Sequence, residues 1–162
     1  HYFGQKGLPE LPLFGLRFSV PFLAEHVEWQ GLSGETYPDR KKGGVFGIWE
    51  SPLEKPDYLV PQEYGCHMDT VWMKLKADDG SNALRITMSG RQPFHFSAVP
   101  YTPEELENAL HKEELPDPRR TVVSILAAMR GVGGIDSWGS DVEEAYRVSA
   151  EEDIDYEFMI SR

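Results

Sequence analysis

Apolar and polar residues alternate along six stretches of the chain, and a period of two residues is typical of half-buried antiparallel strands. These stretches are residues 16–20, the residues around Val27 and Trp29, and residues 71–75, 84–88, 94–96 and 154–160. Residues 121–129 have no polar face, so they form either a central strand covered on both sides or a short helix. We predict a strand, because β-branched residues begin the run and Gly131 follows it.

One segment departs from this alternation and predicts a helix. Residues 102–105 supply an N-cap threonine, a proline at the first helical position and a capping-box glutamate in register. An apolar stripe follows at Leu106, Ala109 and Leu110. The pattern therefore indicates two to three helical turns that end near His111.

Turn signals separate the predicted strands and leave two long loops. Asp79-Gly80 lies between two alternating runs and predicts a hairpin turn. The long loops are residues 30–47 and 50–66, and long ordered loops on a sandwich commonly carry binding sites. We therefore predict a mainly β fold, an antiparallel β-sandwich with one short helix, in which residues 1–162 form a single domain.

The charge and the cysteine content limit which partners the protein binds and in which cellular compartment it is expected. The chain has 27 acidic and 16 basic side chains and a net charge of −11, which argues against nucleic acid and anionic membranes as partners. No apolar run approaches the roughly 20 residues that span a bilayer. The lone cysteine, Cys66, excludes an internal disulfide and a cysteine zinc cluster, so we expect a soluble, cytoplasmic protein. Because the chain begins at His1, we expect a processed product or an excised fragment.

The most unusual segment is residues 131–139, which hold four glycines and end in Trp138-Gly139. Glycine permits unusual backbone conformations, and tryptophan offers a broad apolar face with one N–H donor. Two interpretations are open. Either Trp138 caps the hydrophobic core while the glycines turn a corner, or the loop presents Trp138 to a ligand. Tyr37 and Tyr64 also lie in the long loops, and aromatic faces are a usual means of carbohydrate recognition.

Loop position alone selects four carboxylates for glycosidase chemistry. That chemistry needs two carboxyl groups about 5 Å apart for retention, or about 6.5–9.5 Å apart for inversion. The candidates are Asp39, Glu63, Asp69 and Asp136. In a chain with 27 acidic residues this selection has little weight, and the four residues are better interpreted as solvated carboxylates in turns. Asp39 with Arg40 is also open to interpretation as a structural ion pair or a turn contact.

The remaining reactive side chains offer little catalytic chemistry. The histidines lack the close spacing of a metal-binding helix motif, so surface or hydrogen-bonded roles fit them better; they are His26, His67, His95 and His111. Cys66 precedes His67, but adjacent side chains on an extended backbone point to opposite faces, which disfavours a thiolate pair.

Six motifs in one collinear order resemble the carboxy-terminal part of the large β-galactosidases of glycoside hydrolase family 2, which some bacteria encode partly in a separate small subunit. They cover nearly the whole chain: Trp29-Gln30-Gly31-Leu32, Glu35-Thr36-Tyr37-Pro38-Asp39-Arg40, Pro61-Gln62-Glu63 with Gly65, Asp69 and Trp72, Phe96-Ser97-Ala98 with Pro100-Tyr101-Thr102, residues 131–139, and Tyr146-Arg147.

The resemblance implies a partial β-supersandwich like that of galactose mutarotase, with this chain as its carboxy-terminal portion. Both catalytic glutamates then belong to a TIM-barrel portion, in the same or a separate chain, together with any Mg or Na site. No catalytic residue, cofactor or metal ligand is expected in this chain. Its implied role is to complete the active-site wall for hydrolysis of terminal β-D-galactosides such as lactose, with retention, in an oligomeric enzyme.

The resemblance also assigns roles to particular residues. Trp138 forms the wall beside the leaving-group sugar, and Asp136 and Ser137 join it in substrate binding. The resemblance also implies a structural motif, formed by Tyr37, Asp39, Arg40, Glu63, Gly133 and Gly134.

Several positions depart from the family pattern. Ser33-Gly34 replaces a usual Gly-Pro, Tyr64 stands where asparagine is usual, and Leu126, Met129 and Ile135 replace polar residues around the glycine loop. These departures support a second hypothesis, a structural, oligomerisation or carbohydrate-binding β-sandwich domain that does not contact substrate. A third is a mutarotase-like enzyme, for which the sequence shows no pair of base and acid.

Overall fold

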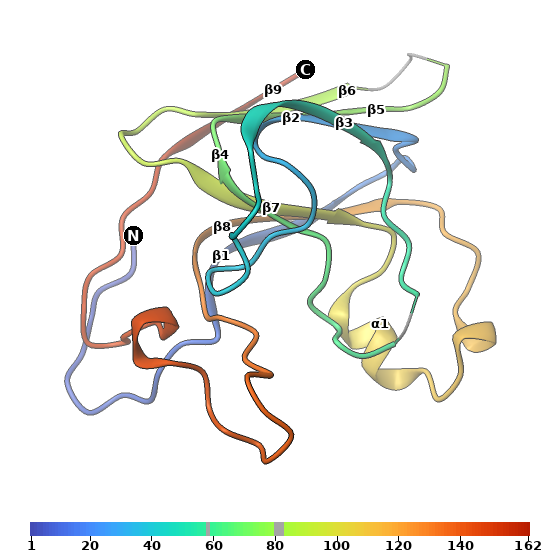
Figure 1. Ribbon diagram of the computed structural model, residues 1–162. Coiled ribbons are helices and arrows are strands. Elements are labelled where there is room, and N and C mark those ends of the chain that lie inside the picture. Colours follow the sequence, from blue (N-terminus) through green and yellow to red (C-terminus); the bar gives the residue numbers. More distant parts are fainter. Residues whose placement is uncertain (58, 80–82) are drawn as a thin grey trace.

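Two antiparallel sheets face each other (Figure 1) in the computed structural model, which describes residues 1–57, 59–79 and 83–162. One sheet has the strand order β1-β8-β7-β4, and the other has the order β3-β2-β5-β6-β9. The predicted mainly β sandwich with one short helix is confirmed. The strands and the α-helix are β1 (Leu13–Val20), β2 (His26–Leu32), β3 (Phe46–Pro52), β4 (Cys66–Thr70), β5 (Trp72–Lys76), β6 (Ala83–Met88), β7 (Phe94–Val99), α1 (Pro103–Asn108), β8 (Thr121–Met129) and β9 (Phe158–Ser161). Two short 3-10 helices cover Lys112–Glu114 and Glu144–Tyr146.

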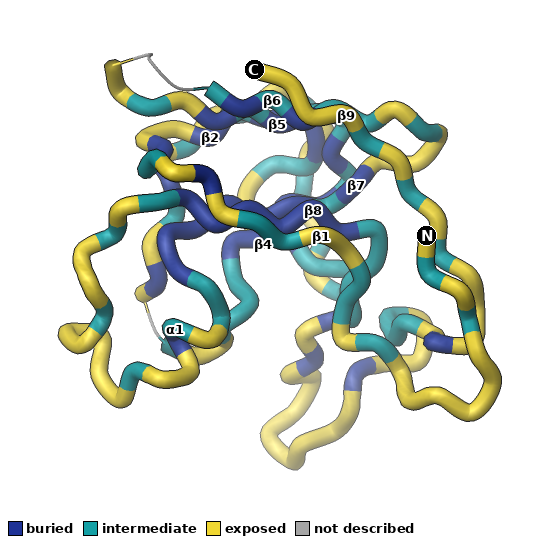
Figure 2. The backbone as a smooth tube through the Cα atoms, turned by 180° about the vertical axis from the view of Figure 1, so that it is seen from behind, coloured by how far each residue is buried: buried dark blue, intermediate teal, exposed yellow. Residues whose placement is uncertain are grey.

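The main core lies between the sheets, because each strand places alternate side chains on its inner face. Trp29 of β2 stands opposite Met73 of β5, and both are buried. Phe96 and Ile125 are paired neighbours on the facing sheet and are also fully buried. Figure 2 shows buried residues following these central strands, while most loops and the edge strands β3 and β9 are more exposed; β4, the edge strand beside β7, is mostly buried.

The four-stranded sheet is covered on its other face as well. Val122, Ser124 and Leu126 alternate along β8 with the core residues Val123 and Ile125, yet all five are buried. In Figure 1, α1 and the long loops lie on this outer side of the sheet. Burial on both faces confirms the prediction of a central strand at residues 121–129 and explains why the run has no polar face.

The helix begins as predicted but ends early. Thr102 caps it, and the capping box with Glu105 is formed. The backbone becomes extended at Ala109, and Leu110 is 82% exposed, so the prediction of two to three turns ending near His111 was wrong. Leu106 is the buried residue of α1, and one buried side chain gives a short helix too little packing to extend it. None of the helices among the described residues has the length and apolar character needed to span a membrane.

Two strands were missed: β3 overlaps the adjoining ends of the predicted loops at residues 30–47 and 50–66, and β4 begins at the last residue of the second loop. β3 is an edge strand, paired only with β2 among the described strands. β4 lacks a period of two, because its register with β7 shifts between His67 and Thr70, where Asp69 has a positive φ of 55°. A local bulge of this kind removes the alternation on which a strand prediction depends.

The ends of the other predicted strands also needed correction. The last strand covers Phe158–Ser161 and not residues 154–160; Ile154 instead forms an isolated bridge with Tyr2. β5 and β6 pair antiparallel, with Lys76 opposite Ala83, as a hairpin requires. The turn predicted at Asp79-Gly80 includes Gly80, which lies outside the described residues.

Candidate functional site

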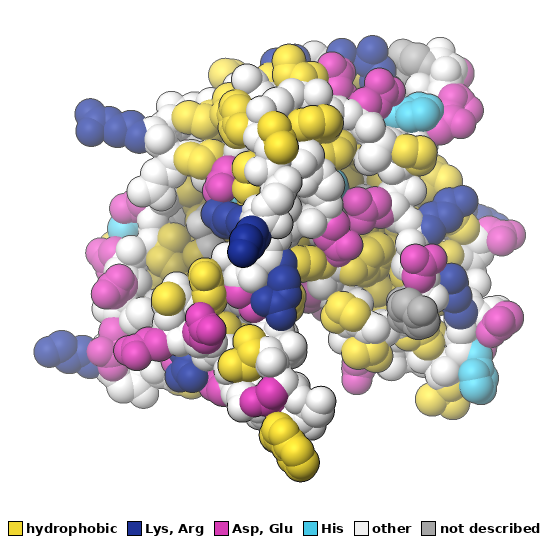
Figure 3. All heavy atoms as spheres, in the orientation of Figure 1, with side chains coloured by type: hydrophobic (Ala, Val, Ile, Leu, Met, Phe, Trp, Pro, Cys, Tyr) yellow, Lys and Arg dark blue, Asp and Glu magenta, His cyan; other side chains and the backbone are white. Residues whose placement is uncertain are grey.

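The glycine-rich loop, residues 131–139, follows β8 on the outer side of the four-stranded sheet. It extends away from the body of the protein in Figure 1, and Figure 3 shows a hydrophobic side chain at the lower tip of the molecule. Gly133 and Gly134 have φ values of 71° and 70°, in the left-handed region that glycine adopts without strain. Trp138 is 92% exposed, so the interpretation of Trp138 as a core residue was wrong and the ring faces solvent.

The base of this loop is anchored by Asp39, whose side chain is 5% exposed. Its two carboxylate oxygens accept the backbone N–H groups of Val132 at 2.9 Å and Gly133 at 2.8 Å. A side chain at Gly131 would place its Cβ 2.8 Å from Asp39 Cγ, so only glycine allows this close approach. Burial opposes ionisation of Asp39, but the backbone hydrogen bonds outweigh it and lower the pKa of this carboxyl.

Arg40 completes the anchor from the same turn. Its Nη2 donates to the carbonyl of Gly133, and its Nη1 donates to the carbonyl of Asp39 at 2.9 Å. Arg40 also lies 3.4 Å from the Asp39 carboxylate, as the structural ion-pair interpretation predicted. The structure thus brings together four members of the expected structural motif: Asp39, Arg40, Gly133 and Gly134.

The other two members of that motif lie apart from the anchor. Glu63 accepts two hydrogen bonds from Arg17 Nη2, at 2.5 and 2.7 Å, and so connects the loop before β4 to β1. Tyr37 donates its hydroxyl to Glu35 and lines a separate hollow described below.

Asp136 and Ser137 are exposed together with Trp138 at the outer part of the loop. Asp136 accepts hydrogen bonds from the Ser140 hydroxyl, from the Trp138 N–H at 2.8 Å and from the Ser140 N–H at 3.2 Å. The Ser140 hydroxyl, followed by the two N–H groups, lowers the pKa of Asp136. Asp136 therefore shapes the loop that carries Trp138.

The four carboxylates chosen by loop position make structural contacts. Asp39 and Asp136 hold the glycine loop, Glu63 pairs with Arg17, and Asp69 accepts Lys41 Nζ at 2.9 and 3.1 Å. The side chain of Asp39 is almost entirely covered, so the interpretation as a solvated turn carboxylate was wrong for this residue.

The histidines and the cysteine are also explained by local contacts. His67 is buried, with its ring stacked on Phe96, and His26 lies 3.6 Å from Glu50 on the surface. Burial lowers the pKa of His95 to about 4, and its Nδ1 accepts the backbone N–H of Asp69. Burial raises the pKa of Cys66, which keeps it a thiol. Among residues 1–57, 59–79 and 83–162, no three His, Cys, Asp or Glu side chains are placed to hold a metal ion.

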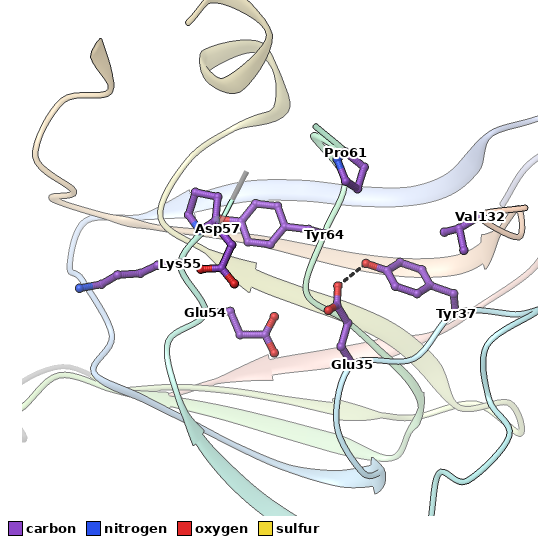
Figure 4. Close-up of a pocket in the computed structure, with 9 residues that line it drawn as sticks. Glu35, Tyr37, Glu54, Lys55, Asp57, Pro61, Tyr64 and Val132 are labelled. Atoms are coloured by element: carbon purple, nitrogen blue, oxygen red, sulfur yellow. Dashed lines mark hydrogen bonds between the residues drawn. The ribbon is translucent and has the colours of Figure 1, made fainter. Parts of the chain in front are cut away.

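A hollow of about 580 Å³ lies beside the anchor, between the two long loops. We call it the acidic hollow; its lining includes Glu35, Tyr37, Glu54, Pro61, Tyr64 and Val132 (Figure 4). The long-loop prediction pointed to this region, but Glu35 and Glu54 were missed as site candidates. In the sequence they are two carboxylates among many, and only the fold brings them together.

Comparison with known proteins shows the family. A family model described as the β-galactosidase small chain matches residues 2–160, nearly the whole chain. The chain belongs to the β-galactosidase small-chain family. The small subunit of a β-galactosidase from Latilactobacillus sakei is 52% identical over 170 residues, an alignment that covers 99% of this chain and 53% of that protein.

Longer proteins align with this chain as well. β-Galactosidase BgaC of Bifidobacterium adolescentis is 38% identical over 157 residues, which cover 93% of this chain and 15% of that protein. A β-galactosidase of Streptococcus thermophilus is 36% identical over 163 residues, covering 99% of this chain and 16% of that protein. The chain thus spans about half the length of the small subunit that it matches, and a much smaller part of the longer enzymes.

Two of the positions that depart from the family pattern can be located in the structure. Leu126 is buried against Gly15, where an added Cβ would lie 2.8 Å from Leu126 Cδ2. Ile135 is exposed on the glycine loop. The anchor at Asp39 uses backbone groups of the loop, so the loss of polar side chains at these positions leaves it intact.

Proposed function

We propose that this chain is a non-catalytic, carboxy-terminal portion of a β-galactosidase of glycoside hydrolase family 2. Trp138 forms one wall of the active site beside the leaving-group sugar. The acid/base and nucleophilic carboxylates, with any Mg or Na ion, act from a TIM-barrel portion in the same or a separate chain. The reaction is hydrolysis of terminal β-D-galactosides such as lactose, with retention, in the cytoplasm, and the fold is part of a β-supersandwich.

The observation that carries the proposal is the exposed ring of Trp138 on a loop whose first residues are held by hydrogen bonds. Trp138 is 92% exposed, whereas Asp39 holds the start of the loop through two backbone hydrogen bonds. Val132 and Ile135 are exposed on the same loop, and a group of exposed apolar side chains supports a surface that contacts a partner or a substrate. A flat ring held in place orients a remote sugar and thereby positions the scissile bond.

The test is Trp138→Ala in the enzyme assembled with its catalytic portion. A sugar that covers one face of the ring removes about 60 Å² of apolar surface from water, worth about 1.5 kcal/mol, or about a tenfold rise in KM for lactose. Trp138→Phe retains a flat face and serves as the matched variant, with a smaller rise. Unchanged KM values and unchanged transfer to sugar acceptors in Trp138→Ala would exclude the wall role.

A second candidate function is assembly without substrate contact, and the edge strand β3 favours it. Phe46 and Ile48 are 53% and 63% exposed on this strand, and Val45 beside them is also exposed. Apolar side chains in such a row are typical of a surface that another protein covers. If this function is the main one, Ile48→Glu lowers the mass of the assembled enzyme in light scattering, and Trp138→Ala leaves lactose kinetics unchanged.

A further inference from the structure

The returning half of the glycine loop is held by a second set of contacts, which includes the Tyr146-Arg147 motif of the sequence. In Figure 1 the chain leaves β8, forms the loop and comes back through the short 3-10 helix Glu144–Tyr146, beside the N-terminal segment. The backbone N–H of Gly131 donates to the Tyr146 carbonyl at 2.9 Å, so the two ends of this excursion meet. Residues 131–146 thus form an Ω-loop, a surface loop whose ends lie close together.

A closed ring of ion pairs lies where the two ends of the Ω-loop meet. Arg130, just before the loop, pairs with Asp141 and lies 3.7 Å from Glu10 of the N-terminal segment. Arg147, just after the loop, lies 3.1 Å from the same Asp141 and 3.4 Å from the same Glu10. We call these residues the clasp: Glu10, Arg130, Asp141 and Arg147. A single ion pair on a surface contributes little, but in this network each charge has two neighbours of opposite sign.

The clasp also holds the backbone of the returning half. Asp141 accepts the backbone N–H of Val142 at 2.8 Å, and Arg147 Nε donates to the Val142 carbonyl at 2.8 Å. Val142 is 4% exposed and packs over Gly133, where an added Cβ would lie 3.2 Å from Val142 Cγ2. The clasp therefore joins the end of the loop to its beginning, which Asp39 holds.

Trp138 lies between these two fixed points, in the part of the loop with the most backbone freedom. Gly134 and Gly139 stand on either side of it with φ values of 70° and 78°, and glycine has the widest range of backbone conformations. The hydrogen bonds of Asp136 join residues within this tip to one another. A tip fixed at one end only is free to turn about the glycines, whereas a tip fixed at both ends has one direction.

We propose that Asp141 and Arg147 are positioning residues for Trp138, because the clasp fixes the direction in which the ring faces the sugar. The proposal rests on the wall role proposed above, in which Trp138 contacts the leaving-group sugar. The clasp residues do not touch the sugar; they raise the fraction of molecules in which the ring is ready to bind it. If loss of the clasp leaves the ring in that direction for about a third of the time, the KM for lactose rises about threefold.

The test measures the order of the loop and the kinetics separately. Asp141→Asn removes the negative charge from the clasp, while the amide oxygen still accepts the Val142 N–H. In NMR relaxation of the whole chain, the order parameter of the Trp138 backbone amide is expected to fall from about 0.85 to below about 0.6. The amide of the buried Trp29 is expected to keep its value, which shows that the fold is intact. In the assembled enzyme we expect an approximately threefold rise in KM for lactose, with kcat changed by less than about twofold.

Three further variants grade the effect. Arg147→Gln removes the positive charge and is expected to act like Asp141→Asn. Arg147→Lys retains that charge and is expected to recover part of the order and of the KM. Glu143→Gln is the matched control, because Glu143 is an exposed carboxylate on the same loop whose side chain makes no capping hydrogen bond, and we expect it to change neither measurement.

Kinetics in the Trp138→Ala background separate positioning from a general effect on the enzyme. Asp141→Asn is expected to add nothing there, because the clasp acts only through the ring. An additional rise in KM in that background, or an unchanged order parameter in Asp141→Asn, would overturn the proposal. If Trp138→Ala raises KM and Asp141→Asn does not, the wall role stands and the positioning role is overturned. If Trp138→Ala itself leaves KM unchanged, it is the wall role that fails, and the positioning role falls with it.

Discussion

The anchor of the glycine loop predicts a large effect for Asp39→Asn, a change that keeps the size of the side chain. The amide oxygen still accepts one backbone N–H, but the amide NH₂ then faces the second donor, and the charge is lost from both bonds. Hydrogen bonds to a charged group are worth about 1.5–3 kcal/mol each, and Asp39 is 5% exposed, so water does not replace them freely. We expect the free energy of unfolding to fall by about 2–3 kcal/mol.

Urea unfolding followed by circular dichroism measures the global loss, and hydrogen exchange locates it. The backbone N–H groups of Val132 and Gly133 donate hydrogen bonds to Asp39, and their hydrogens are expected to exchange at least about tenfold faster in Asp39→Asn. Asp136→Asn is the matched control, because Asp136 also accepts backbone N–H groups of this loop but is exposed, so water compensates and the loss is smaller. If Asp39→Asn leaves both stability and exchange unchanged, Asp39 does not anchor the loop.

The pH dependence gives an independent check with a definite sign. The pKa of Asp39 is lowered in the folded chain from its ordinary value of 3.8: burial acts against ionisation, but the hydrogen bonds from Val132 and Gly133 outweigh it. A carboxyl with a lowered folded pKa stabilises the fold above its ordinary pKa and loses that contribution as the pH falls through the folded value. The stability difference between wild type and Asp39→Asn is therefore full at pH 7 and shrinks below about pH 4.

Three smaller predictions follow from other contacts. Gly131→Ala places a Cβ 2.8 Å from Asp39 Cγ and is expected to cost about 1–3 kcal/mol in thermal unfolding; an unchanged melting temperature would contradict this close approach. Thr102→Ala breaks the capping box with Glu105 and is expected to cost about 1 kcal/mol, and a loss below 0.3 kcal/mol or so would argue against the cap. Cys66 is buried with a raised pKa, so iodoacetamide is expected to label it only in denaturant, and rapid labelling of the native chain would refute its burial.

Local signals in the sequence predicted the parts of the fold that depend on local chemistry. The apolar run of β8 and the capping box of α1 are each encoded by residues close together in the sequence, and both predictions were confirmed. β4 was missed, because the bulge at Asp69 breaks the alternation, and the length of α1 was wrong, because Leu110 finds nothing to pack against.

The candidate site was predictable only in part, because it depends on contacts between distant segments. The glycines and the tryptophan of the loop are visible in the sequence, and the family resemblance assigned Trp138 its proposed role. The contact of Asp39 with Val132, however, joins residues that are 93 positions apart, and no local pattern indicates it. The same is true of Glu35 and Glu54 in the acidic hollow, and of the exposure of Trp138.

Because of the anchor, the glycine loop takes its fixed position only after the whole chain has folded. Asp39 follows β2, whereas residues 131–139 follow β8, so the loop acquires its fixed base only when early and late parts of the chain have come together. A partly folded chain carries the same tryptophan without a defined direction. In the assembly proposed above, a partner surface shaped to the fixed loop would therefore bind folded copies in preference to partly folded ones.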